Sequence, residues 1–289
     1  EIHTDDPTAF WERIEAIGDQ FKQTRPDKAH LQWAVDTMLR VVHHSSASIE
    51  AVRAQLLAQA QAIQADDFRL CHAIGDYGVK ALPSSPTKLT VLTHCNHGAL
   101  ATSGYGTSLG IMRSLWHAGR LERVYAAETR PTFQGSRLTA WECVQEGIPV
   151  TVITDSMAAH CMQKGLIHAV LAGADCIAAN GDTIGKIGTY SLALLAQAHT
   201  IPFVVAAPVS TIDFTLATGE GIAIAEHAPE EIYQLGNAQG TPGSPRVTSP
   251  NGAEFYNPAS DVTPARLITA IVTEKGAFAA DQLEALRAE

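Results

Sequence analysis

From residue 89 onward the chain alternates short apolar runs with longer segments of helical composition, and this alternation constrains its fold more than any other feature. Strands covered by helices on both faces are continuously apolar, and strand–helix–strand units wind right-handedly into a parallel sheet. The pattern therefore predicts an α/β fold with a Rossmann-like, doubly wound parallel sheet. The expected strands are 89–94, 123–127, 150–154, 169–172 and 203–206, and the helices between them are 106–118, 136–146, 156–164 and 188–199.

The start of the chain shows no such alternation, and its apolar side chains recur at helical spacing. A proline-rich connection then separates the two patterns. We therefore expect a mostly helical N-terminal domain over residues 1–82 and a Rossmann-like domain over 87–289. Toward the C-terminus we expect a loop-rich stretch over 213–260, a helix that starts at Thr263-Pro264, and a last helix over 281–287.

Composition argues against several classes of function. Acidic side chains outnumber basic ones by 30 to 20, so no basic excess is available to neutralise the phosphates of a nucleic acid. No stretch of about 18 consecutive apolar residues occurs, which argues against a membrane span. The five cysteines are odd in number and irregularly spaced, which argues against a secreted disulfide framework, and they form no CxxC pair, so no structural zinc site is predicted. We expect a cytoplasmic protein that binds no metal, nucleic acid or membrane.

Reactive side chains collect where the expected strands end. Cys95 follows the first strand, Glu128 and Arg130 follow the second, Asp155 the third and Asp175 the fourth. Ligands of open parallel sheets bind beyond the carboxyl ends of the strands, so these residues predict a site at that edge. A single aspartate after a strand is commonly the cap of the next helix, and we interpret Asp155 or Ser156 as such a cap.

Cys95 has two interpretations. A lone cysteine beside an apolar strand is most often a packed, inert residue. Cys95 instead ends its strand and precedes a helix, where helix N-termini and nearby cations lower the pKa of a thiol. This position makes it a candidate acid, base or nucleophile, whereas the other four cysteines are expected only to pack.

Two glycine-rich segments could hold a phosphate with backbone N–H groups. Residues 104–110 resemble a GxGxxG dinucleotide fingerprint, but about ten residues separate them from the preceding strand, where such loops usually have two to six. An NAD-dependent oxidoreductase is therefore a minor alternative. The second segment, 180–189, includes Lys186 as a point charge for phosphate.

Several sequence blocks carry a resemblance to a known family. They are Thr93-His94-Cys95-Asn96, Glu128-Thr129-Arg130-Pro131, Gln134-Gly135-Ser136-Arg137-Leu138-Thr139-Ala140, Gly173-Ala174-Asp175, Ala179-Asn180-Gly181-Asp182, Lys186-Ile187-Gly188-Thr189-Tyr190, Asn257-Pro258, Asp261-Val262-Thr263-Pro264 and Thr273-Glu274-Lys275-Gly276. In this order they resemble methylthioribose-1-phosphate isomerase of methionine salvage. That family is homologous to the regulatory subunits of translation initiation factor 2B and to ribose-1,5-bisphosphate isomerase.

The resemblance implies an aldose–ketose isomerase, an intramolecular oxidoreductase that needs no cofactor and forms homodimers. Its small-molecule substrate would be 5-methylthioribose-1-phosphate and its product 5-methylthioribulose-1-phosphate. Cys95 and Asp175 would be the catalytic pair. The residues that would bind the sugar phosphate are Arg25, Arg130, Gln134, Asn180 and Lys186. The retained cysteine favours the catalytic branch over a non-catalytic regulatory subunit, which stays an alternative.

Some positions depart from the family pattern. Its early Arg-Gly-Ala-Pro-Ala-Ile-Gly block is missing, and we expect it upstream of Glu1. After Arg25-Pro26 the family has Thr-Ala-Val-Asn-Leu. The residues found instead are Asp27-Lys28-Ala29-His30-Leu31, and further on Cys176 replaces an Arg, Gly185 an Asn and His97 an Ala. These changes leave a related substrate open, such as 5-deoxyribose-1-phosphate or ribose-1,5-bisphosphate.

The expected chemistry follows from the substrate. A sugar phosphorylated on its anomeric oxygen must have its ring oxygen protonated while the bond from C1 breaks, and hydrogen then moves from C2 to C1. Asp175 lies in an apolar stretch, where desolvation raises the pKa of a carboxyl group, so we expect it to be the acid. Cys95 is expected to act as base at C2 or to shuttle the proton, and a 1,2-hydride shift is the rival route.

Overall fold

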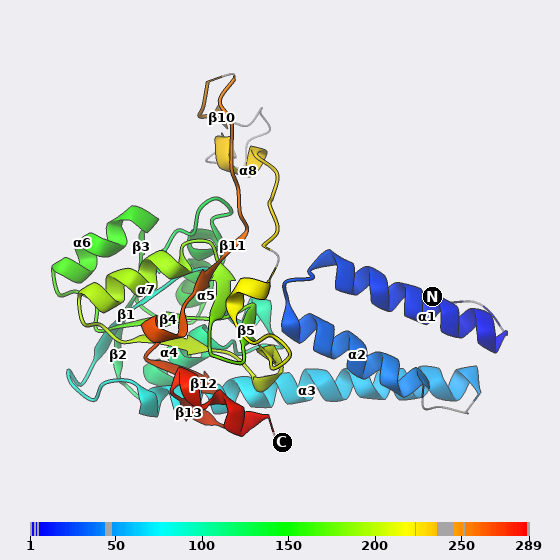
Figure 1. Cartoon of the computed structure of the whole chain (residues 1–289). Helices are drawn as coiled ribbons and strands as arrows, with labels where there is room; N and C mark the ends of the chain where they lie inside the picture. The colour runs from blue at the N-terminus through cyan, green and yellow to red at the C-terminus, as the bar shows by residue number, and fades with distance from the viewer. Residues whose placement is uncertain are drawn as a thin grey trace.

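Three helices precede the sheet and form an arm that projects from the α/β body (Figure 1). The computed structural model describes residues 2, 4, 6–43, 48–222, 224–235, 246–250 and 252–287. The helices are α1 (Pro7–Thr24), α2 (Ala29–His43) and α3 (Ile49–Ala81). The side chain of Asp6 caps α1 and that of Ser48 caps α3, because each accepts a hydrogen bond from a backbone N–H of the first turn. The predicted helical start of the chain is confirmed.

Helix α3 belongs to both the arm and the body. It has 33 residues, and its last turns pack against α4 (Ser108–His117) and the sheet. Two glycines allow this close approach. A Cβ on Gly75 would lie 2.3 Å from Ser114 Oγ, and one on Gly78 would lie 2.4 Å from the Ile111 side chain. Ile74 on the same turns is completely buried in the core beneath the sheet.

The predicted doubly wound parallel sheet is confirmed. Its seven strands have the order β13-β12-β7-β4-β1-β2-β3, and all neighbours run parallel except β12 and β13. The strands are β1 (Leu89–Thr93), β2 (Leu121–Ala127), β3 (Val150–Ile153), β4 (Ala169–Ala172), β7 (Phe203–Ala206), β12 (Ala270–Thr273) and β13 (Gly276–Phe278). The last two were not predicted.

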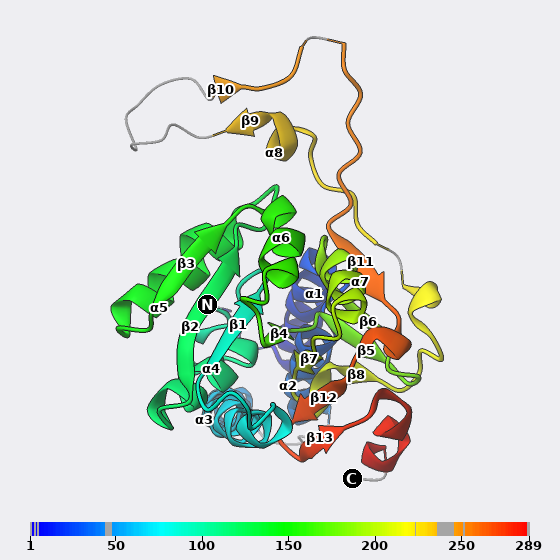
Figure 2. The same ribbon diagram turned by 90° about the vertical axis from the view of Figure 1, so that its left-hand side faces the viewer.

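Helices cover both faces of this sheet, as Figure 2 shows. Alternate residues of β1 belong to different cores, since Leu92 packs on one side and Val91 on the other. The first core includes side chains of α6 (Ala158–Gln163) and α7 (Thr189–Ala198), and the second includes those of α3, α4 and α5 (Ala140–Gln145). Residues 94–107 separate β1 from α4, which is the long connection that disfavours a dinucleotide fingerprint.

A second sheet of four strands was missed by the sequence reasoning. Its order is β11-β6-β5-β8. The strands are β5 (Cys176–Ala178), β6 (Thr183–Lys186), β8 (Ile212–Asp213) and β11 (Ser260–Thr263). The segment 180–189 is therefore a hairpin turn followed by a strand, rather than only a glycine-rich helix start.

Two predicted C-terminal helices need correction. At Thr263-Pro264 strand β11 ends, and only a short 3-10 turn over Ala265–Leu267 follows. The last segment, Ala280–Leu286, is a 3-10 helix and not an α-helix.

Part of the stretch predicted to be loop-rich projects away from the body as α8 (Glu230–Tyr233), β9 (Gln234–Leu235) and β10 (Arg246–Val247), whereas its residues 236–245 lie outside the described ranges (Figure 2). None of the helices within the described ranges has the length and apolar character needed to cross a membrane.

Candidate active site

Cys95 sits in a fixed, buried position at the end of β1. Its backbone has a positive φ of 63°, a conformation that non-glycine residues adopt at a cost and that often marks functional sites. Its N–H donates to Thr129 Oγ1 at 2.8 Å, and its carbonyl accepts from Thr139 Oγ1 at 2.7 Å. Its thiol lies 3.4 Å from Gln134 Oε1. The structure thus brings together Cys95 and Gln134.

The turn after β2 is held by Asp155. One carboxylate oxygen accepts from the N–H of Thr129 at 2.9 Å, and the other accepts from the N–H of Arg130 at 2.7 Å. Our interpretation of Asp155 as a helix cap is therefore wrong. Its side chain reaches from the end of β3 to the end of β2. It thereby fixes Thr129, whose hydroxyl accepts the hydrogen bond from the N–H of Cys95.

A buried carboxylate organises the loop that follows Cys95. Glu142 of α5 accepts from Asn96 Nδ2 at 2.9 Å and from the N–H of Ala99 at 2.7 Å, and it forms an ion pair with buried Arg113 at 2.7 Å. A Cβ on Gly98 would lie 2.3 Å from this carboxylate, so only glycine fits there. Sequence reasoning missed Glu142, because its role depends on contacts between distant residues.

Asp175 is buried where β5 begins, and the start of α2 lies against it. Its N–H donates to the carbonyl of Ile184 at 2.8 Å, and its own carbonyl accepts from the N–H of Ala29 at 3.1 Å. The ammonium of Lys28 forms an ion pair with its carboxylate. An ammonium in contact with a carboxyl group stabilises the ionised form. This contact was not predicted.

The charges of three cations act on the thiol of Cys95. Burial raises the pKa of this thiol, and the opposing effects of the Asn96 N–H and of the charges on Lys28, Lys186 and Arg25 do not reverse the rise. The expected depression of the thiol pKa is therefore wrong, and the thiol is protonated at neutral pH. Burial, followed by repulsion from Arg25, lowers the pKa of the Lys28 ammonium to about 8.

The two other cations differ in their partners. Arg25 donates to both carboxylate oxygens of Asp27, at 3.1 and 2.9 Å. Lys186 is buried at the end of β6, and within the described ranges no carboxylate forms an ion pair with it. An ammonium that is buried without a countercharge is costly unless an anion binds to it.

Cys95, Asp175 and the three cations form the central cluster of the site. Two predicted site residues, Arg130 and Asn180, have their hydrogen-bond partners outside this cluster. Arg130 donates to the carbonyls of Pro131 and Ile232, and its guanidinium lies 4.8 Å from the centre of the Phe133 ring. Asn180 lies in the turn between β5 and β6, where its amide donates to Asp182 at 2.9 Å. That turn is the opposite end of the hairpin from Asp175 and Lys186.

The comparison with known proteins places this architecture in a family. Residues 1–280 match the model of the initiation factor 2 subunit family. The chain belongs to this family. It is 56% identical over 287 residues to the methylthioribose-1-phosphate isomerase of Nostoc punctiforme, a match that covers 99% of this chain and 79% of that protein. It is 58% identical over 287 residues to the protein of the same name from Synechocystis sp., covering 99% and 80%.

Solved structures of family members agree with the fold. The 5-methylthioribose 1-phosphate isomerase of Pyrococcus horikoshii superposes with a TM-score of 0.85 at 36% identity, covering 99% of this chain and 77% of that chain. The delta subunit of translation initiation factor eIF-2B from A. fulgidus superposes with a TM-score of 0.78 at 37% identity, covering 96% and 78%. The family thus includes an enzyme and a translation factor with similar folds, and the site must decide between them.

His97 is one position at which this family member departs from the pattern. Its ring packs on Gly173, where a Cβ would lie 2.2 Å from Cδ2. Among the described residues no group forms a hydrogen bond with its buried Nδ1. Burial, followed by the charges of Lys28 and His94, lowers the pKa of His97 to about 3, so the ring is neutral.

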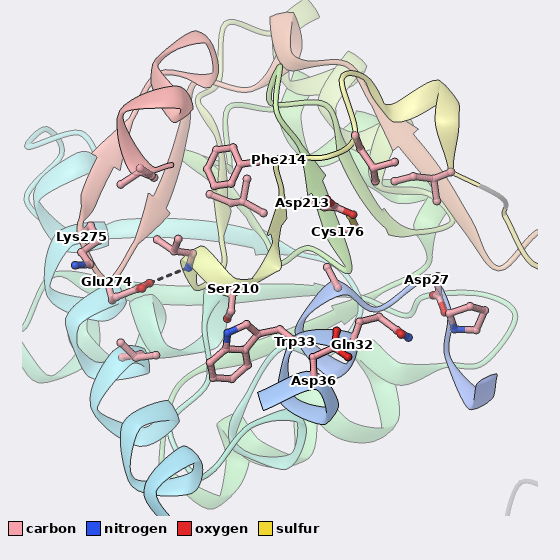
Figure 3. Close-up of a pocket in the computed structure, with 18 of the residues that line it drawn as sticks. Asp27, Gln32, Trp33, Asp36, Cys176, Ser210, Asp213, Phe214, Glu274 and Lys275 are labelled. Atoms are coloured by element: carbon pink, nitrogen blue, oxygen red, sulfur yellow. Dashed lines mark hydrogen bonds between the residues drawn. The ribbon is translucent and has the colours of Figure 1, made fainter. Parts of the chain in front are cut away.

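A cleft of about 630 Å³ lies beside the cluster. Figure 3 shows Asp27 and Cys176 on its wall, together with Trp33, Ser210 and Phe214. Asp27 and Cys176 are the chain neighbours of Lys28 and Asp175, whereas Cys95 does not line the cleft. The cleft therefore adjoins the ion pair between Lys28 and Asp175 without including the thiol.

Proposed function

We propose that this chain is an aldose–ketose isomerase of methionine salvage that converts 5-methylthioribose-1-phosphate into 5-methylthioribulose-1-phosphate. The observation that carries the proposal is the buried Cys95 thiol, on which the charges of three cations act, with Asp175 held nearby by Lys28. The identity of 56–58% to proteins named for this activity supports the same function. The reaction moves hydrogen within the substrate and needs no external electron donor or acceptor.

Cys95 and Asp175 form the catalytic pair of this proposal, and the cations bind the phosphate. Lys186 is the principal phosphate ligand, because its buried ammonium has no countercharge among the described residues. Arg25 joins it if the substrate displaces Asp27 from the guanidinium. Gln134 lies against the thiol and orients the sugar beside it. Arg130 and Asn180 are weaker candidates for substrate binding, since both form hydrogen bonds with groups outside the cluster.

The route of the hydrogen follows from the state of the thiol. A protonated thiol is a poor base for a C–H bond, since the thiolate is the reactive form. The protonated thiol therefore favours a 1,2-hydride shift from C2 to C1, with the buried Cys95 side chain beside the migrating hydrogen. In the same step the C2 hydroxyl loses its proton and becomes the carbonyl of the ketose.

A regulatory role like that of the translation factor is the second candidate, and its similar fold supports it. Cys95 distinguishes the two, because a subunit that only senses a ligand does not need a strained, buried thiol. We also propose a homodimer, as the family resemblance implies, and a reducing compartment such as the cytoplasm, since all five cysteines are buried and free.

An isomerase assay tests the function directly. The purified chain is given 5-methylthioribose-1-phosphate, 5-deoxyribose-1-phosphate and ribose-1,5-bisphosphate, and ketose formation is followed for each. We expect the highest kcat/KM with the methylthio sugar. Absence of turnover with all three, together with thermal stabilisation by a nucleotide, would instead support the regulatory role.

A further inference from the structure

We propose that His94 is a positioning residue of this enzyme, and that its imidazole ring fixes the spacing between the thiol of Cys95 and the ammonium of Lys186. This role presupposes the isomerase activity proposed above, in which Lys186 binds the phosphate and Cys95 lies beside the migrating hydrogen. The His94 side chain is only 2% exposed, so it acts through these two residues and not by touching the sugar.

One nitrogen of the His94 ring holds the turn that follows Lys186. Its Nε2 lies 2.8 Å from the carbonyl oxygen of Ile187, the next residue along the chain. Gly188 then packs closely on the ring, since a Cβ there would lie 3.0 Å from both Cε1 and Nε2. The backbone that carries the Lys186 side chain is therefore tied to the end of β1.

The other ring nitrogen faces the residue that holds Cys95. His94 Nδ1 lies 3.5 Å from Thr129 Oγ1 and 3.8 Å from a carboxylate oxygen of Asp155. Thr129 Oγ1 accepts the hydrogen bond from the N–H of Cys95 at 2.8 Å, and Asp155 accepts from the N–H of Thr129 at 2.9 Å. The ring thus lies between the residues that support the thiol and the turn that supports the ammonium.

The turn after Lys186 has a second support that is independent of His94. The carboxylate of Asp261 accepts from the N–H groups of Gly188 and Tyr190, at 2.7 and 3.1 Å. These bonds join β11 to the turn and to the start of α7, and neither reaches the end of β1. Loss of the histidine should therefore leave the ammonium within its own turn and change its separation from the thiol.

The His94 ring is neutral, and its partner shows which nitrogen carries the proton. Burial lowers the pKa of the ring, and the opposing effects of the Ile187 carbonyl and of Asp155 do not reverse this. A neutral imidazole has one N–H, and a carbonyl oxygen can only accept. The N–H is therefore on Nε2, where it donates to Ile187. A neutral donor holds the turn without adding a charge that would repel Lys186.

The substrate needs a fixed separation, because one short molecule must reach both groups. Its phosphate is attached through oxygen to C1, and the hydrogen leaves C2, the next carbon. With the phosphate on Lys186, the distance between the two side chains decides where C2 lies relative to Cys95. A misplacement of about 1 Å can cost about 10²-fold in rate. His94 should therefore act on kcat, whereas affinity for the phosphate depends on Lys186 itself.

The experiment compares His94→Gln, His94→Met and His94→Asn with the wild type on 5-methylthioribose-1-phosphate. Glutamine can place an amide N–H near the position of Nε2, methionine has a similar length without a donor, and asparagine is too short to reach Ile187. His168→Gln is the matched control. The His168 ring also bonds to the backbone of β1, since it accepts from the N–H of Thr90 at 2.9 Å, but at the end of the strand away from the site.

For each protein kcat, the dissociation constant of inorganic phosphate and a thermal melt are measured, the second by titration calorimetry. We expect His94→Met and His94→Asn to lose kcat by about 10²-fold, and His94→Gln to recover most of this loss. The dissociation constant of phosphate should change by less than about threefold in all three variants. His168→Gln should keep the wild-type kcat. Rescue by glutamine separates positioning from a general loosening of the fold, which would weaken phosphate binding as well.

Three outcomes would overturn the inference. One is a folded His94→Met or His94→Asn variant with a kcat within about threefold of the wild type, and either variant decides alone if the other does not fold. Another is a folded His94→Gln variant as slow as the other two, or a failure of both donor-free variants to fold, since either would make the ring a structural support. The third is a wild type inactive on all three sugars, which removes the proposed function and this inference together, whereas an active wild type with fully active His94 variants removes only the inference.

Discussion

Replacement of Glu142 by alanine tests whether the loop of Cys95 is held from behind by a buried charge. The carboxylate of Glu142 accepts hydrogen bonds from Asn96 and Ala99 and pairs with Arg113, and it is only 2% exposed. Removing one member of a buried ion pair costs about 3–5 kcal/mol, and a buried donor left without an acceptor costs about 1–3 kcal/mol. Arg113 keeps a second partner, Glu146, so we expect the lower end of the range, about 3 kcal/mol.

The assay is urea denaturation followed by the fluorescence of the four tryptophans. Glu146→Ala is the matched control, because Glu146 contacts the same arginine but is 36% exposed, and we expect it to cost about 1 kcal/mol. Glu142→Gln should fall between the two, since its amide oxygen still accepts one hydrogen bond. If Glu142→Ala unfolds within about 1 kcal/mol of the wild type, the loop is not held in this way.

Three further predictions concern the site itself. Asp175→Asn should lose activity by about 10²–10⁴-fold in the isomerase assay and still fold if its carboxyl group is the acid, and near-native turnover would remove Asp175 from the mechanism. Cys95→Ser should also lose activity and still fold, and near-native turnover would remove the thiol from the mechanism. Because the Cys95 thiol is protonated, ketose made in heavy water should carry no deuterium at C1 by NMR, and deuterium there would indicate proton transfer. His97 has a folded pKa of about 3, below its unfolded value, so stability should fall as pH drops from about 6.5 toward 3, and a His97→Asn variant with an unchanged acid melt profile would contradict this.

The central sheet could be predicted from sequence because its strands are buried on both faces and therefore form continuous apolar runs. β4 and β7 have the predicted bounds. The second sheet could not, because β5 has three residues and β6 includes Gly185 and Lys186, so neither shows a run or an alternation. Short strands of this kind are defined by their pairing partners rather than by their own residues.

The site could be predicted in part for a related reason. Cys95 and Asp175 follow strands, and the topology of a parallel sheet places strand ends at one edge. Lys28 reaches Asp175 from 147 positions away, a contact that only the packing of the arm creates. The sequence block around Asn180 resembles one that binds substrate in the family. In the structure, however, Asn180 lies in the turn between β5 and β6, away from the cluster. The thiol pKa was misjudged because the burial of Cys95 outweighs its three cations.

The continuous helix α3 has a consequence for how this protein can be divided. Its last turns supply Ile74 to the core under the sheet, and its first turns support the arm that delivers Lys28. A fragment that begins at residue 87 would therefore lack the side chains with which α3 covers one face of the sheet. The arm alone would expose the apolar residues in the last turns of α3 to water. We therefore expect the arm and the α/β body to be inherited and exchanged together and to unfold together. Separate fragments would regain activity only if they reassociate along α3.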